Sequence, residues 1–347
     1  MFIQSHETYM KRCLQLAAQG LGKVAPNPMV GCVIVHQNQI IAEGYHEVYG
    51  SAHAEPNAIK QVNDELLKNC TLYVTLEPCS HFGKTPPCAD LIIDKGIKHV
   101  VIGNLDSNPL VSGKGVQKLR DAGINVEYGI LDEECRELNK RFFTFHEQKR
   151  PYVILKWAQT LDGYISRWPL PENKTENWIT GNESKQLVHN WRTQEQAILI
   201  GHNTLVADNP LLTARLAKGK NPIRMVLSKY LELDANLNVF NHDAPTVIFN
   251  TKQQETNEHT EFVKIDWNNR TQEVLNYCFQ KGISSLIIEG GTQTIEQFMQ
   301  TNAWDEARLF INPNQTFGNG IKAPLINLDN KIPVTVGKDW LYTLQNT

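Results

Sequence analysis

One imidazole and two thiols in the first half of the sequence have the types and spacing of a catalytic metal site. His53 opens the tripeptide His-Ala-Glu, and Cys79 and Cys88 each follow a proline. One imidazole and two thiolates suit Zn²⁺, and three protein ligands leave one position of a tetrahedral ion open. An open position is typical of a catalytic ion, since structural zinc normally has four protein ligands. The sequence therefore predicts that His53, Cys79 and Cys88 bind zinc.

Glu55, two residues after His53, is the candidate catalytic proton carrier. His-x-Glu followed by Pro-Cys and a later Cys is the signature of zinc deaminases, in which the glutamate is the general acid and base. Residues two apart face opposite sides of a regular helix, so we expect Pro56 to place Glu55 at the first turn, where the chain bends. Zinc lowers the pKa of a bound water to about 7, which produces hydroxide at neutral pH. Glu55 would carry protons to a ring nitrogen and to the leaving amino group, so we expect hydrolytic deamination.

Two other interpretations of these residues stay open. His53, Cys79 and Cys88 could be buried structural residues, or a structural zinc could take His46 or His81 as its fourth ligand. The remaining cysteines are expected to be small core residues: Cys13, Cys32, Cys70, Cys135 and Cys278.

The elements expected around these motifs form two α/β halves. Strands alternate with helices, which implies a layered structure with a largely parallel sheet. In the first half we expect helices at 10–21, 56–67, 88–95, 115–122 and 132–147, and strands at 30–35, 40–45, 72–76, 98–102 and 124–128. In the second half we expect strands at 152–158, 197–201, 223–228, 245–250, 285–289 and 306–311, helices at 183–194, 271–281 and 293–301, and a solvated loop at 251–260. The segment Lys149-Arg150-Pro151 separates two predicted domains, 1–147 and 151–347.

The composition is that of an ordinary folded protein. The 347 residues are 41% hydrophobic and 20% charged, with a formal net charge of −3. This balance argues against a general nucleic-acid or anionic-membrane binder. No apolar run approaches the roughly 18 residues that cross a bilayer. The N-terminus does not resemble a secretory signal, and seven cysteines make an odd number for a disulfide framework. We therefore expect a cytoplasmic protein.

Longer motifs resemble a known family over nearly the whole chain. The first half contains PNPMVGCV at 26–33, TLEPCSH at 75–81 and GKTPPC at 83–88. The second half contains LK at 155–156, TLDG at 160–163, WITG at 178–181, TLVADNPLLT at 204–213 and IEGG at 288–291. Together these motifs resemble the bifunctional riboflavin-biosynthesis deaminase–reductases. Cys88 lies nine positions after Cys79, unlike the short Cys-x-x-Cys of cytidine and tRNA adenosine deaminases, and this makes the resemblance specific.

The resemblance implies a fold, two reactions and two cofactors. The fold would be a cytidine-deaminase-like three-layer domain followed by a dihydrofolate-reductase-like α/β domain. Zinc would serve the hydrolytic deamination of 2,5-diamino-6-(5-phosphoribosylamino)pyrimidin-4(3H)-one, and NADPH would then reduce the ribosyl group to ribityl. As partners we expect this phosphorylated pyrimidine and further copies of the chain in a homo-oligomer, but neither nucleic acid nor a membrane.

The resemblance also implies site residues. Asn27 would hydrogen-bond the pyrimidine, although it could equally be a turn residue, and His81 and Lys84 could face the substrate phosphate or lie in a solvated loop. NADPH would contact Ala158, Trp178, Thr204, Asp208, Gly291, Thr292, Gln293 and Thr294, within a segment that extends to Gln297. The reductase substrate would contact Lys156, Arg192, Leu212, Arg215 and Glu289.

From the residues alone, the reductase signal is weaker. No Gly-x-Gly-x-x-Gly occurs, which disfavours a Rossmann site, but a strand, Gly290-Gly291 and a helix would let backbone approach a phosphate. Glu176 and Lys229 stand where the family commonly has serine, and the stretch 166–177 is longer than usual, which makes the cofactor preference less secure. Two alternatives stay open: a deaminase of another nucleobase substrate, and a second half that binds a ligand without catalysis.

Overall fold

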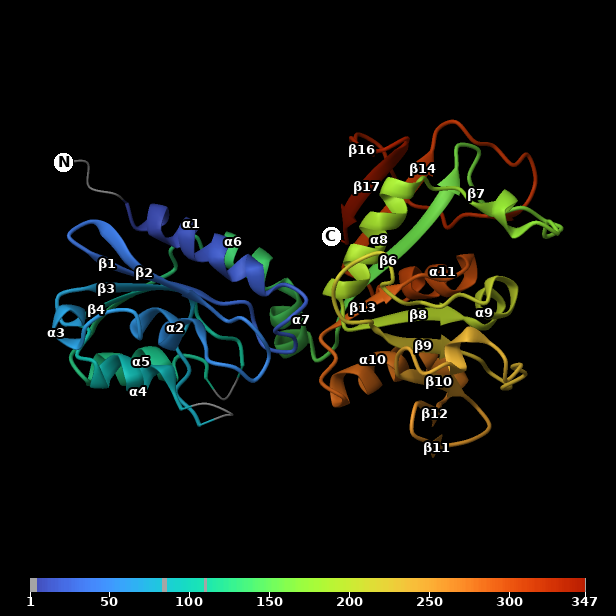
Figure 1. Ribbon diagram of the computed structural model, residues 1–347. Coiled ribbons are helices and arrows are strands. Elements are labelled where there is room, and N and C mark those ends of the chain that lie inside the picture. Colours follow the sequence, from blue (N-terminus) through green and yellow to red (C-terminus); the bar gives the residue numbers. More distant parts are fainter. Residues whose placement is uncertain (1–4, 83–85, 109–110, 347) are drawn as a thin grey trace. The chain divides into compact units, whose positions relative to one another are not determined.

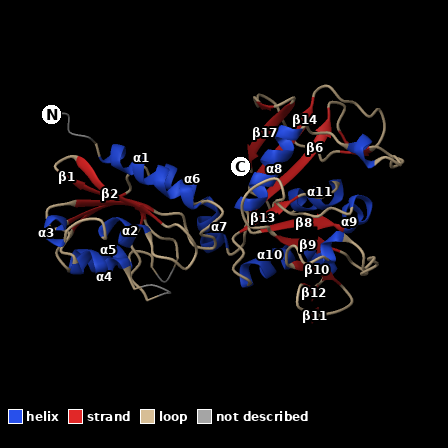
Figure 2. Cartoon of the chain, viewed as in Figure 1, coloured by secondary structure: helices blue, strands red, loops and turns tan. Residues whose placement is uncertain are grey.

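The computed structural model describes residues 5–82, 86–108 and 111–346 of the chain. The chain folds into two compact units, Met1–Lys149 and Arg150–Thr347. Each unit has its own sheet and its own apolar core (Figures 1 and 2).

The first unit is built on a five-stranded sheet. Its strands are β1 (Gly31–His36), β2 (Gln39–Tyr45), β3 (Thr71–Leu76), β4 (His99–Asn104) and β5 (Asn125–Tyr128). They lie in the order β2-β1-β3-β4-β5, in which β1 is antiparallel to both neighbours and β3, β4 and β5 are parallel. The β1–β2 hairpin turns at Gln37 and Asn38, whose φ angles of 49° and 63° are those of a type I′ turn.

Helices cover both faces of this sheet, so the predicted three layers are present (Figure 1). One face packs against α1 and α6 through Met10, Cys13 and Cys135, and the other against α2, α4 and α5 through residues such as Ala58 and Ile92. The helices are α1 (His6–Ala17), the 3₁₀ turn η1 (Ala18–Gly20), α2 (Ala54–Ile59), α3 (Asp64–Leu67), α4 (Cys88–Asp94), α5 (Lys114–Asp121), α6 (Asp132–Leu138) and α7 (Lys140–Gln148).

Two helices of the first unit are shorter than predicted. The helix expected at 56–67 is two helices, because the Asn63 side chain accepts a hydrogen bond from the Glu65 amide and starts α3 separately. The helix expected at 132–147 breaks at Asn139, whose side chain binds both the N–H and the C=O of Met29 at 2.8 Å. Both breaks arise where a side-chain amide binds backbone in place of the regular helical pattern.

The second unit is built on a ten-stranded mixed sheet. Its strands are β6 (Tyr152–Thr160), β8 (Ala197–Gly201), β9 (Ile223–Leu227), β10 (Thr246–Asn250), β11 (Glu255–Thr256), β12 (Thr260–Lys264), β13 (Ser285–Ile288), β14 (Glu306–Asn312), β16 (Val334–Val336) and β17 (Asp339–Gln345). Their order is β11-β12-β10-β9-β8-β13-β6-β14-β17-β16, parallel from β12 to β14 and antiparallel at both edges. A separate antiparallel pair joins β7 (Tyr164–Ser166) to β15 (Ile321–Lys322).

Helices lie on both faces of this second sheet. They are α8 (Asn182–Gln194), α9 (His202–Asp208), α10 (Arg270–Gln280) and α11 (Thr292–Gln300), with 3₁₀ turns η2 (Lys174–Asn177), η3 (Asn238–Phe240) and η4 (Trp267–Asn269). Val274 and Phe298 anchor α10 and α11 in one core, and Val188 and Leu205 anchor α8 and α9 on the other face. β8 runs directly into α9 and β13 ends just before α11, so the carboxyl ends of the parallel strands gather at one edge, where α/β proteins bind ligands.

The polar stretch at 251–260 was expected to be a solvated loop, but only part of it is a loop. It contains β11, and Thr260 begins β12, which pairs with β10. Both residues of β11 are polar and exposed, and β12 is short and mostly half-buried, so the segment lacks the long apolar pattern of a buried strand. The helix α9 and the strand β17 were not predicted either. Among the described residues, no helix has the length and apolar character needed to span a bilayer.

Candidate metal centre and second site

Three predicted ligands converge in the first unit. His53 directly precedes α2, Cys79 follows β3, and Cys88 is the first residue of α4. The Nδ1 atom of His53 lies 3.4 Å from Sγ of Cys88 and 3.7 Å from Sγ of Cys79, and all three ligand atoms lie within 4.8 Å of one another. Within the described residues, these three side chains form the one group of His, Cys, Asp or Glu that is close enough together to hold a metal ion.

The two thiols share one negative charge. Hydrogen bonds from the Cys88 thiol and from His53 lower the pKa of Cys79 to about 4. The pKa of Cys88 is raised instead, because Cys79 already holds the charge and Cys88 is buried. A divalent cation compensates two thiolates at once, and one imidazole with two thiolates is a donor set that zinc prefers. The residues present therefore fit zinc.

Glu55 lies in the first turn of α2, at the position where Pro56 was expected to place it. The residue is 3% exposed. Burial raises the pKa of Glu55 to about 7, although His53 and a hydrogen bond with the Cys88 thiol favour its charged form. The carboxyl group thus lies against the ligand cluster and is enclosed by protein.

His46 determines how Asn27 is oriented. Nδ1 of His46 lies 3.1 Å from the carbonyl oxygen of Ala52, which can only accept, so this nitrogen carries the proton. Nε2 is then an acceptor, and it lies 3.2 Å from Nδ2 of Asn27. The Oδ1 atom of Asn27 is therefore the side of the amide left for a ligand. Because both ring nitrogens of His46 are engaged, His46 does not supply the fourth metal ligand considered above.

Two further candidates, His81 and Lys84, lie between Cys79 and Cys88. Nδ1 of His81 is buried and has no hydrogen-bond partner within the described ranges. Lys84 lies outside the described residues.

Glu77 is a structural residue of this site that the sequence did not reveal. Its Oε1 accepts from the amides of Gly115 and Val116, at 2.8 and 3.1 Å, and its Oε2 accepts from Gly113 at 2.9 Å and Asp106 at 3.1 Å. Through these four hydrogen bonds, Glu77 connects the segment that follows β4 to the chain just before Cys79. A glutamate at the end of an apolar strand, next to Pro-Cys, was the signal available in the sequence.

Charged residues form a second cluster in the other unit. Glu289 follows β13 and accepts from Nε and Nη2 of Arg192 at 3.1 and 2.9 Å, while Nζ of Lys156, on β6, lies 3.5 Å away. Burial alone would raise the pKa of Glu289, but the charges of Arg192 and Lys156 outweigh it and lower the pKa to about 2. The structure therefore brings together three of the five predicted substrate residues of the reductase.

Some of the predicted cofactor residues, Gly291 to Thr294, lie at the start of α11. The Gly291 amide donates to Oγ1 of Thr204 on α9 at 2.9 Å. A Cβ at Gly290 would lie 2.9 Å from Cβ of Thr294, and one at Gly201 would lie 2.5 Å from its Oγ1. Gly201 and Gly290 therefore leave the space that the Thr294 side chain occupies at the N-terminus of α11.

The remaining predicted residues lie on neighbouring elements of the same unit. Ala158 is on β6, Asp208 ends α9, and Thr292 and Gln293 open α11. Trp178 is 59% exposed, and Nζ of Lys185 lies 3.7 Å from its ring centroid. Leu212 is buried, and Arg215 lies in the segment between α9 and β9.

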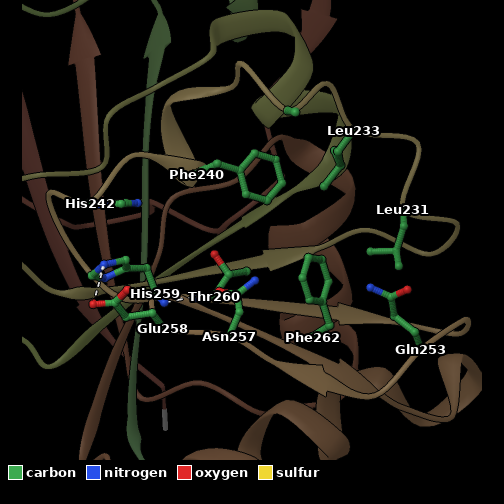
Figure 3. Close-up of a pocket in the computed structure, with 11 residues that line it drawn as sticks. Leu231, Leu233, Phe240, His242, Gln253, Asn257, Glu258, His259, Thr260 and Phe262 are labelled. Carbon is green, nitrogen blue, oxygen red and sulfur yellow. Dashed lines mark hydrogen bonds and ion pairs between the residues drawn. The ribbon is translucent and has the colours of Figure 1, made fainter.

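A cavity of about 680 Å³ in the second unit is lined by none of these residues (Figure 3). Its walls combine apolar side chains with a stacked histidine pair, His242 and His259, whose ring centroids are 3.9 Å apart. The remaining lining residues are Leu231, Leu233, Ala235, Phe240, Gln253, Asn257, Glu258, Thr260 and Phe262. The chemistry predicted for this unit therefore does not lie in this cavity.

Two family models match the chain. Residues 3–104 match the cytidine and deoxycytidylate deaminase zinc-binding region, and residues 151–328 match the RibD C-terminal domain. Both matches cover the segments that hold the two clusters described above.

Curated relatives match over most of their length. The chain is 42% identical to the riboflavin biosynthesis protein RibD of Aquifex aeolicus, over 92% of this chain and 90% of that protein. It is 40% identical to RibD of Actinobacillus pleuropneumoniae, over 91% of this chain and 86% of that protein.

Two solved structures match over nearly the whole chain. A deaminase/5-amino-6-(5-phosphoribosylamino)uracil reductase from Thermotoga maritima has a TM-score of 0.86 and 38% identity, and the match covers 98% of both chains. Acinetobacter baumannii RibD has a TM-score of 0.86 and 31% identity, again over 98% of both chains.

Proposed function

Because the chain belongs to the RibD family of riboflavin-biosynthesis proteins, we propose that it catalyses two consecutive reactions, one in each unit. The first is hydrolytic deamination of 2,5-diamino-6-(5-phosphoribosylamino)pyrimidin-4(3H)-one. The second is NADPH-dependent reduction of the ribosyl group to ribityl. The observation that carries the first reaction is the convergence of His53, Cys79 and Cys88 within 4.8 Å, with buried Glu55 against them.

In the first unit, His53, Cys79 and Cys88 would hold zinc. The bound ion would lower the pKa of a water molecule and so supply the nucleophile at neutral pH. Glu55 would accept a proton from the attacking water and pass it to a ring nitrogen. It would then carry a second proton, from the hydroxyl group of the tetrahedral carbon, to the departing amino group, which leaves as ammonia. Its enclosure keeps bulk water from competing for the proton. Asn27, oriented by His46, offers Oδ1 to an N–H of the pyrimidine.

In the second unit, Gly290 to Thr294 and Thr204 would hold NADPH, which supplies the hydride. Glu289 directly follows β13, and Lys156 lies in the middle of the neighbouring parallel strand β6, with Nζ 3.5 Å from the Glu289 carboxylate, so the two can orient the sugar carbon that is reduced. Arg192 and Arg215 can pair with the substrate's anionic end, since guanidinium groups bind phosphate through two parallel hydrogen bonds. None of the observations favours the alternative of another nucleobase substrate with a non-catalytic second half.

A two-stage assay tests the proposal. We expect the purified zinc-loaded chain to release ammonia from the diaminopyrimidinone phosphate and then to oxidise NADPH. Lys156→Ala should leave ammonia release unchanged and abolish NADPH oxidation, whereas Lys264→Ala, an exposed lysine on β12, should affect neither. Ammonia release with no NADPH oxidation by the wild-type chain would support a non-catalytic second half instead.

Homo-oligomer formation and a reducing cytoplasmic location stay predictions. All seven cysteines are free thiols, which is compatible with a reducing compartment. Analytical ultracentrifugation of the purified chain tests the oligomeric state.

A further inference from the structure

His189 is a buried histidine for which neither reaction above has a use. It lies on α8 and is 6% exposed. Its Nδ1 atom is enclosed and has no hydrogen-bond partner in the part of the chain that the structure describes. A buried ring N–H without an acceptor costs more than a buried lone pair on the same nitrogen would, so the proton belongs on Nε2. Nε2 is then a hydrogen-bond donor and the nitrogen through which the ring can reach a ligand.

The neighbours of His189 are cationic side chains from one face of α8 and one adjacent segment. Lys185, His189 and Arg192 are spaced at i, i+4 and i+7, so they share a face of the helix. The segment that carries Arg215 is tied to this helix on both sides. Nη1 of Arg192 donates to the carbonyl of Thr213 at 3.0 Å, and the Gln186 amide donates to the carbonyl of Leu216.

The charges around His189 are unbalanced in the protein by itself. Arg192, Arg215 and Lys156 all repel a proton on the ring, and Glu289 is the acid that attracts one. Glu289 is already bound by Arg192 and Lys156. Burial and these cations lower the pKa of His189 to about 4, so the ring is neutral at neutral pH. The cluster therefore has positive charge and donors beyond what Glu289 compensates, which suits an anion with several acceptor oxygens.

We propose that His189 is a phosphate-binding residue of the reductase site, and that its Nε2–H donates to a phosphate oxygen which Arg192 and Arg215 also contact. This inference rests on the proposed reduction of a ribosyl phosphate. A phosphomonoester offers three acceptor oxygens. The guanidinium groups of Arg192 and Arg215 supply positive charge and paired, coplanar N–H donors to it. The neutral imidazole adds a directed hydrogen-bond donor to the site. A further cation in its place would have to be buried without a counter-ion whenever no ligand is bound, and burying an unpaired charge is costly.

The test uses ribose 5-phosphate and ribose as competitive inhibitors of NADPH oxidation with the deaminated substrate. We expect ribose 5-phosphate to inhibit the wild-type chain more strongly than ribose does. His189→Met, which keeps a similar volume without a donor, should raise the inhibition constant of ribose 5-phosphate about tenfold or more, as expected for a lost hydrogen bond to a charged group. The constant for ribose and the value of kcat should change less than about threefold, because the lost bond is to the phosphate alone.

His189→Gln is the rescue variant, since its amide nitrogen lies near the position of Nε2. It should restore ribose 5-phosphate inhibition to near the wild-type value, and His242→Met, a histidine of the cavity in Figure 3, should have no effect. The proposal fails if His189→Met leaves the ribose 5-phosphate constant unchanged, if it weakens ribose equally, or if His189→Gln behaves like His189→Met. A wild-type chain that oxidises no NADPH would instead contradict the proposed reduction. If His189→Met does not fold, judged by thermal unfolding, His189→Leu takes its place, and calorimetry must show the same selective loss of ribose 5-phosphate binding relative to His189→Gln.

Discussion

At the scale of single residues, the site of the first unit depends on side chains that three separate segments bring together. His53 precedes α2, Cys79 follows β3 and Cys88 opens α4. Each of the three residues lies at or near the end of a helix or strand. Their backbone positions are therefore held by regular structure before a metal binds. Glu55 adds a carboxyl group that burial keeps from bulk water.

Glu55→Gln separates metal binding from proton transfer. The amide preserves size but cannot accept or release the proton, so kcat for ammonia release should fall by about 10² to 10⁴. Zinc content, measured by mass spectrometry, should stay unchanged. Glu65→Gln, an exposed position on α3, is the matched control. A Glu55→Gln chain that retains zinc and deaminates at the normal rate would refute the assigned role.

His46→Phe tests the orientation of Asn27. Phenylalanine keeps an aromatic ring but offers no acceptor to Nδ2 of Asn27, so the amide can turn over. We expect KM for deamination to rise about tenfold, the effect of one misdirected hydrogen bond, with zinc content unchanged. An unchanged KM in steady-state assays would mean that the amide orientation does not depend on His46.

At the scale of elements, two carboxylates hold loops and strands in place. Glu77 accepts four backbone hydrogen bonds from residues 106 to 116 and so fixes the segment that follows β4. Close packing leaves no room for a side chain there, since a Cβ at Gly115 would lie 2.1 Å from the carbonyl oxygen of Pro78. Glu289 has the corresponding role at the end of β13, where it joins α8 to β6.

Glu77→Ala should destabilise the first unit. The substitution leaves four backbone amides, three of them buried, without their acceptor, and each buried loss costs about 1–3 kcal/mol unless water replaces it. We expect the free energy of unfolding to fall by at least about 2 kcal/mol. Zinc release during urea titration reports on this unit, and Glu7→Ala on the exposed side of α1 is the control. Equal midpoints for the two variants would contradict the structural role.

The charge of Glu289 predicts how acid affects the second unit. Its pKa is about 2 in the folded chain, against about 4.3 for an unperturbed glutamate, so its contribution to stability is complete above about pH 4.5 and is lost as pH falls toward 2. At about 1.4 kcal/mol per pKa unit the contribution is roughly 3 kcal/mol.

Urea unfolding of wild type and Glu289→Gln at pH 6, 4.5 and 3.5 measures this contribution. The gap in unfolding free energy between the two should narrow as the pH falls, because Glu289 of the unfolded wild-type chain takes up a proton near its ordinary pKa, whereas the folded chain still holds it charged. Glu258→Gln, at a largely exposed position, should show no such gap. A gap that stays constant over this range would mean that the pKa of Glu289 is the same in the folded and the unfolded chain.

At the scale of the whole molecule, the two units have separate cores and separate chemistry. The predicted fold class, a cytidine-deaminase-like domain followed by a dihydrofolate-reductase-like domain, is confirmed by the family models and by the Thermotoga maritima structure. The metal ligands all belong to the first unit, and the Lys156, Arg192 and Glu289 cluster belongs to the second.

Zinc removal should therefore affect one reaction alone. After treatment with a chelator, ammonia release should be lost, whereas NADPH oxidation with the already deaminated compound should continue at the untreated rate. Added zinc should restore ammonia release. Loss of NADPH oxidation on chelation, with recovery on zinc addition, would show that the second reaction also needs the metal.

The convergent residues His53, Cys79 and Cys88, the position of Glu55 and the family could be inferred from the order of residues, because the motifs that carry them are short and local. Most helices and strands could be inferred for the same reason, since periodicity and turn residues act over a few positions. The breaks at Asn63 and Asn139 and the strands β11 and β12 could not, because they depend on side-chain caps, on Met29 and on an edge of a sheet.

The roles of His46, Glu77 and His189 were visible only once the chain was folded. Each depends on partners distant in sequence: Asn27 for His46, the amides of 106 to 116 for Glu77, and Arg215, Lys156 and Glu289 for His189. Residue types and spacing specify chemistry within a segment. The tautomer of a ring, the acceptors of a carboxylate and the charge around an imidazole are set by tertiary packing, since burial and long-range contacts decide them.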